Sequence, residues 1–102
     1  MFLVEINIKE TELNKLTETE ATMMLEQHRK WFNNYAEKGT FLLVGPFKNS
    51  GMSGMIISKN DNIELLQAII SEDVYYPNLA EYSIREFSAN IISDKLKNYK
   101  GE

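Results

Sequence analysis

Residues 17–46 read TETEATMMLEQHRKWFNNYAEKGTFLLVGP and predict a long helix followed by a strand. Thr17 and Glu20 have the spacing of a capping box, in which each side chain satisfies a free backbone N–H of the first helical turn. Gly39 is well placed to end the helix in a left-handed conformation, and the apolar run at 41–44 predicts a strand. One apolar stripe follows the helix at helical spacing and consists of Ala21, Met24, Leu25, His28, Trp31, Phe32, Tyr35 and Ala36.

The segments on either side of this unit complete one small α+β domain. Their predicted ranges are a strand at 2–8, a loop at 47–54, a strand at 55–57, a helix at 61–71, a turn at 75–78 and a strand at 79–88. Asp61 and Glu64 repeat the capping spacing at the start of the second helix. The order predicts a ferredoxin-like βαββαβ plan, with a four-stranded antiparallel sheet and both helices on one face. Residues 1–102 form a single domain in this interpretation, with a core at about 1–90 and a loosely attached tail at 91–102.

The second and third predicted strands are apolar at consecutive positions, at 41–44 and 55–57. A sheet with one face in water alternates between apolar and polar side chains, as the strand at 2–8 does. We therefore expect the second face of the sheet to be covered. A second copy of the chain is the simplest cover, which predicts a homodimer.

Composition excludes several classes of function. The formal net charge of −4 opposes binding to phosphate backbones, so we expect no nucleic-acid partner. The chain has no cysteine, which excludes disulfides, thiolate metal sites and a cysteine nucleophile. No apolar run approaches the roughly 20 residues that span a bilayer, and the N-terminal segment contains Glu5 and has no basic lead-in. We expect a cytoplasmic protein with no membrane partner, no metal and no cofactor.

Several short signals follow one another as they do in YciI-related proteins, and the resemblance covers nearly the whole chain. They are the helix segment His28-Arg29-Lys30-Trp31-Phe32, the strand Phe41-Leu42-Leu43-Val44-Gly45-Pro46, the pair Glu72-Asp73, and the segment Leu79–Phe87. The resemblance implies a ferredoxin-like fold, a dimeric α/β barrel, and a pocket with one histidine and one aspartate, which correspond to His28 and Asp73. The family includes a dehydrochlorinase of aromatic degradation that uses such a pair. The fold of the family is similar to that of muconolactone isomerases. Val74 stands where the family usually has proline.

His28 and Asp73 are the candidate catalytic residues. His28 is the only histidine, and imidazole exchanges a proton near neutral pH. Asp73 follows the second helix, where the helix dipole destabilises a carboxylate by roughly 0.3–1 kcal/mol. A carboxylate at this position therefore requires a compensating partner. The candidate substrate-binding residues Gly45, Pro46 and Tyr75 border the cleft, whereas Trp31 and Phe32 are assigned to the core.

Two functions remain open from the sequence. The first is a small cofactor-independent enzyme, an isomerase or lyase, that acts on a small aromatic or lactone-like molecule. His28 is then its general base or acid, and Asp73 orients the ring. The second is a dimeric module that binds a small ligand without catalysis, in which His28 and Asp73 bond to the ligand or to each other. A histidine in an apolar stripe is also typical of an ordinary core residue.

Overall fold

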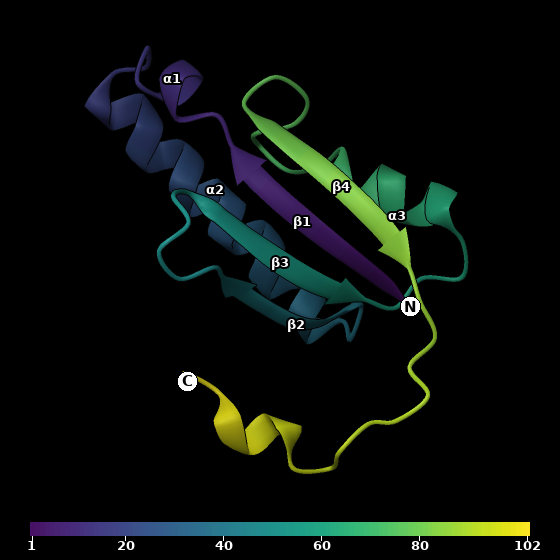
Figure 1. Cartoon of the computed structure of the whole chain (residues 1–102). Helices are drawn as coiled ribbons and strands as arrows, with labels where there is room; N and C mark the ends of the chain where they lie inside the picture. The colour runs from purple at the N-terminus through teal and green to yellow at the C-terminus, as the bar shows by residue number, and fades with distance from the viewer.

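The computed structural model describes all 102 residues and contains one four-stranded antiparallel sheet with the order β2-β3-β1-β4 (Figure 1). The strands are β1 (Phe2–Ile8), β2 (Phe41–Pro46), β3 (Ser53–Ser58) and β4 (Ala80–Glu86). The helices are α1 (Glu10–Leu13), α2 (Glu18–Glu37) and α3 (Ile63–Ile70), followed by the 3-10 helix η1 (Leu96–Tyr99). The predicted α+β class and antiparallel sheet are confirmed, and the strand order is compatible with a ferredoxin-like fold.

The core lies between the sheet and the helices α2 and α3, which cover the same side of the sheet (Figure 1). It draws alternate residues from the strands, as the period of two in β1 predicts. Its buried members are Phe2, Val4, Ile6, Trp31, Tyr35, Phe41, Ile56, Leu66, Ile70, Tyr75 and Ala80. None of the helices combines the length and the apolar character that crossing a bilayer requires.

Helix α2 begins and ends as the sequence predicts. The Thr17 side chain accepts from the Glu20 backbone N–H at 3.1 Å, and the Glu20 carboxylate accepts from the Thr17 N–H at 3.1 Å. After the last turn, Gly39 adopts a φ of +78°, a left-handed conformation that glycine takes without strain. Both ends of α2 are therefore fixed locally, and so is the direction in which its apolar stripe faces.

Two local predictions need correction, and one short helix was not predicted. The residue that caps α3 is Asn62, whose side chain accepts from the Leu65 N–H at 2.9 Å, and not Asp61 one position earlier. The loop predicted at 47–54 is shorter, because β3 already begins at Ser53. The short helix α1 was not predicted, since four residues are too few to show a helical period.

The sheet has one open face, opposite the helices. The pairing of β1 with β3 places Leu3 beside Ile57 and Glu5 beside Met55 on this face. In β2 a register shift between Phe41 and Leu43 displaces Leu42, which is 52% exposed. The apolar residues of β2 therefore point to both faces of the sheet, apart from Leu42, which the register shift displaces from the regular alternation.

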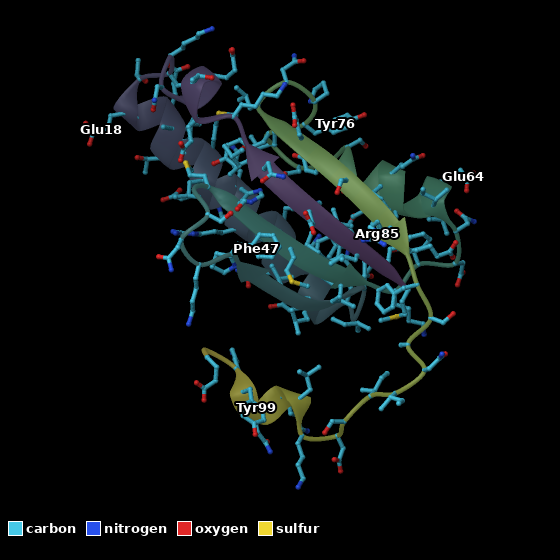
Figure 2. All side chains as sticks on the ribbon, in the orientation of Figure 1. Glu18, Phe47, Glu64, Tyr76, Arg85 and Tyr99 are labelled. Carbon is cyan, nitrogen blue, oxygen red and sulfur yellow. The ribbon has the colours of Figure 1, made fainter.

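The chain after β4 leaves the sheet and makes few contacts with it. Its apolar side chains are exposed, with Ile91 at 94% and Tyr99 at 62%. Figure 2 shows Tyr99 on this segment, apart from the sheet. The Lys48 ammonium donates to the Glu102 backbone carbonyl at 2.8 Å, which joins the end of the segment to the β2–β3 loop.

Candidate functional site

His28 and Asp73 form a buried hydrogen-bonded pair. Nδ1 of His28, on α2, lies 2.7 Å from Oδ1 of Asp73, in the turn after α3. The two residues are 6% and 2% exposed. An ionised carboxylate only accepts hydrogen bonds, so the contact places a proton on Nδ1 and leaves a lone pair on Nε2 when the ring is neutral.

The second oxygen of Asp73 is held by a residue that sequence reasoning missed. The Tyr82 hydroxyl, on β4, donates to Oδ2 of Asp73 at 2.6 Å. Burial, followed by the hydrogen bond and the charge of Asp73, raises the pKa of Tyr82 well above its usual value. Tyr82 therefore remains a hydrogen-bond donor throughout the neutral pH range, and the carboxylate is fixed at both oxygens.

The backbone around Asp73 is ordered by its own hydrogen bonds. The Asp73 N–H donates to the Ile70 carbonyl at 3.0 Å, and the Asp73 carbonyl accepts from the Tyr76 N–H at 3.0 Å. Val74, the residue after Asp73, packs against the core. Asp73 thus contacts His28 without a proline after it.

Three aromatic rings surround the imidazole of His28. The ring centroids of Phe32, Tyr75 and Trp31 lie 4.3, 4.8 and 5.9 Å from that of His28. The Trp31 Nε1–H donates to the Ile69 carbonyl at 3.0 Å, which ties α2 to α3 beside the pair. These contacts leave the imidazole little freedom to rotate, so its unbonded nitrogen keeps one direction.

A cavity of about 430 Å³ opens beside His28, between α2 and the β2–β3 hairpin. Its lining residues are Ile6, Ile8, Leu25, His28, Arg29, Phe32, Val44, Gly45, Pro46, Gly51, Met52, Ser53 and Gly54. Nε2 of His28 has no hydrogen-bond partner in the protein. His28 is the only histidine of the chain, so the cavity is lined by the one imidazole that the chain offers for proton transfer.

The predicted cleft residues divide into two groups. Gly45 and Pro46 line the cavity together with His28. Tyr75 does not line it, because its ring is 1% exposed and packs behind the imidazole. Phe32, which the sequence assigned to the core, packs against the core and also lines the cavity. The assignment of Tyr75 to the cleft is therefore corrected, because its ring belongs to the core.

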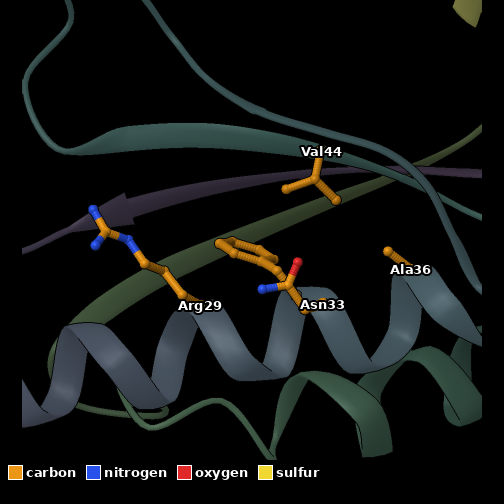
Figure 3. Close-up of a pocket in the computed structure, with 5 residues that line it drawn as sticks. Arg29, Asn33, Ala36 and Val44 are labelled. Carbon is orange, nitrogen blue, oxygen red and sulfur yellow. The ribbon is translucent and has the colours of Figure 1, made fainter. Parts of the chain in front are cut away.

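Arg29 borders both this cavity and a neighbouring one of about 290 Å³, which extends along α2 to Ala36 (Figure 3). Figure 3 shows Arg29 on α2 and Val44 on β2 at opposite sides of the gap between them. Arg29 makes no salt bridge, and its side chain has no hydrogen-bond partner within the chain.

Comparison with models of protein families and with curated proteins found no match to this chain.

The hairpin that forms one wall of the cavity depends on Gly54. A Cβ at this position would lie 2.9 Å from the Gly45 carbonyl oxygen, closer than a side chain can approach. Glycine at 54 thus allows β2 and β3 to converge beside the cavity.

No group of three or more histidine, cysteine, aspartate or glutamate side chains lies close enough together to hold a metal ion.

Tyr82 could have been found from the strand pattern. Ala80, Tyr82 and Ile84 alternate, so Tyr82 belongs to the inner face of β4, where a tyrosine hydroxyl needs a partner. Arg29 carried no such signal, because a charged residue on a helix is usually solvated.

Proposed function

We propose that the chain is a small cofactor-independent enzyme of the YciI-related type, an isomerase or lyase that moves a proton on a small organic molecule. One observation supports this most. His28 borders a cavity with an unbonded Nε2 while Asp73 holds Nδ1 at 2.7 Å. A side chain that is oriented in this way and has access to a ligand meets the geometric requirement for a general base.

The proposed reaction needs only the groups of this site. Nε2 of His28 takes a proton from a carbon of the substrate, and the electron pair of that C–H bond forms a new double bond. In isomerisation the electron pair of an adjacent double bond shifts to a different atom, and that atom takes the proton back from the imidazolium. In elimination a leaving group departs with its electron pair, and the imidazolium releases its proton to the leaving group or to solvent. Asp73 stabilises the imidazolium formed in the first step and keeps the proton on Nδ1 in the resting state.

Dimerisation is part of the proposal. The open face of the sheet carries Leu3, Met55 and Ile57, side chains that a face exposed to water does not favour. A second copy packed on this face would produce the dimeric α/β barrel that the resemblance implies. An apolar interface of this kind buries on the order of 2,000 Å² in total.

A second candidate is a binding module without catalysis. The near-complete burial of His28 and Asp73, and the three rings around the imidazole, also suit a structural pair that shapes a ligand pocket. In this case a ligand would bind in the cavity, and no proton of the ligand would exchange.

Deuterium incorporation separates the two candidates. The protein is incubated in heavy water with a panel of lactones and hydroxylated aromatic compounds, and loss of carbon-bound proton signals is followed by NMR. We expect exchange with at least one class, and a decrease of roughly 10²- to 10⁴-fold in His28→Gln and Asp73→Asn. Lys30→Gln, at an exposed position of the same helix, is the matched control. Binding without exchange in the unmodified protein would favour the module.

A further inference from the structure

We propose that Arg29 is a specificity-determining residue that binds a carboxylate, so the ligand of the cavity is a small organic anion with a flat apolar body. The inference rests on the site of the proposed function. It concerns binding alone and does not require that a reaction follows.

The charge distribution of the cavity supports an anionic ligand. The chain carries a net charge of −4, yet no aspartate or glutamate is among the residues that line the cavity. Arg29 is the one lining residue with a permanent charge. A pocket lined by one fixed positive charge and by no carboxylate attracts anions and disfavours cations.

The free guanidinium of Arg29 supports a carboxylate in particular. Glu26 lies three residues earlier on α2, at a spacing that allows a helical ion pair, but no salt bridge joins the two side chains. The planar fork of N–H donors matches the two oxygens of a carboxylate and can bind both at once. The positive charge of Arg29 also reaches the site, since it opposes the rise that burial and Asp73 cause in the pKa of Tyr75.

The rest of the lining defines the body of the ligand. Phe32 borders both cavities beside Arg29, and Val44 lies opposite on β2. A cavity of about 430 Å³ is at the smaller end of the range for small-molecule sites. A ligand whose carboxylate is bound by Arg29 would lie against Phe32, with its body next to His28.

The test compares benzoate with benzamide, which has nearly the same shape and no charge. Each is titrated into the full-length protein, and the NMR signals of the His28 ring and the Phe32 ring are followed. We expect benzoate to bind and benzamide to bind at least about 10-fold more weakly. In Arg29→Gln, benzoate binding should weaken by roughly 10- to 100-fold while benzamide binding stays the same, since only the charged contact is lost.

Lys30→Gln removes the same charge one position along α2, at a residue that does not line either cavity, and should leave benzoate binding unchanged. Equal losses in the Arg29 and Lys30 variants, or equal binding of benzoate and benzamide, would overturn the inference. The proposed function is tested separately by the proton-exchange assay, because benzoate binding is measured without any reaction. Proton exchange without a carboxylate preference would refute the role of Arg29 alone, whereas a carboxylate preference without exchange would refute the catalytic role of His28 alone.

Discussion

Asp73 and the two tyrosines near it give a prediction at the scale of single residues. Tyr82→Phe removes a donor from a buried carboxylate and should lower the free energy of unfolding by about 1.5–3 kcal/mol. Tyr75→Phe removes a buried hydroxyl that has no hydrogen-bond partner and should stabilise the protein by about 1 kcal/mol. Urea unfolding of both variants measures the difference.

The comparison of these two tyrosines is internally controlled, because each variant loses the same single atom from a largely buried ring. Equal losses of stability would contradict the assignment of Tyr82 as the partner of Asp73. In Tyr82→Phe the ring of His28 should also lose order, which is visible as broadening of its NMR signals.

Tyr35 and Tyr82 give a second prediction, on alkaline pH. Burial, followed by the hydrogen bond and charge of Glu72, raises the pKa of Tyr35 to about 12, and burial with Asp73 raises that of Tyr82. In the unfolded chain both titrate near pH 10, so above about pH 10 the unfolded state releases protons that the folded state keeps. The two tyrosines contribute their full stabilisation below about pH 10. This stabilisation is lost as the pH rises through the pKa values that the tyrosines have in the folded state.

Denaturant unfolding at a series of alkaline pH values tests this sign. The free energy of unfolding should fall steadily above about pH 10, and the fall should be shallower in Tyr35→Phe and in Tyr82→Phe. A steeper fall in either variant would show that the tyrosine is not protected from ionisation by the folded state.

The sequence predicted half of the site at this scale. His28 was recognisable as a histidine within an apolar stripe. Asp73 was recognisable as a carboxylate at the C-terminal end of a helix, where the helix dipole disfavours a negative charge. The alternation of β4 places Tyr82 on the inner face but does not show its partner, and Arg29 carried no signal in the sequence. Tyr82 meets Asp73 only through the pairing of β1 with β4 and the return of the chain after α3.

At the scale of elements, the start of α3 gives a matched pair of variants. Asn62→Ala removes the side chain that accepts from the Leu65 N–H and should destabilise the protein by about 1 kcal/mol. Asp61→Ala alters the neighbouring residue, which makes no capping bond, and should change stability by less than about 0.5 kcal/mol. Thermal unfolding of the two variants would decide which residue is the cap, and the reverse order would contradict the structure.

The elements themselves were largely predictable because each has a clear period or a clear cap. The helix α2 shows both, and β1 alternates over its whole length. The sequence could not decide between Asp61 and Asn62, since both residue types cap helices well. It could not show the register shift in β2 either, because a displaced residue in an apolar run leaves no mark on the pattern.

At the scale of the whole molecule, the open face of the sheet predicts a homodimer. Ile57→Lys places a charge at the centre of this face and should produce a folded monomer, because Ile57 is only partly buried within one chain. Asn34→Lys adds the same charge to the exposed side of α2 and should leave the dimer intact. Sedimentation equilibrium at micromolar concentration measures both. A monomer in the unmodified protein would refute the dimer.

Trp31 gives the molecule its own optical reporter. It is the only tryptophan, and its indole ring stacks on the imidazole of His28 at an interplanar angle of 26°. A charged imidazole quenches the fluorescence of a neighbouring indole more strongly than a neutral one does. Each proton that His28 gains, and each molecule that enters beside Phe32, should therefore change the emission of the unlabelled protein. A stopped-flow fluorimeter could then follow these events on the millisecond scale, with His28→Gln as the variant in which the proton-linked signal is lost.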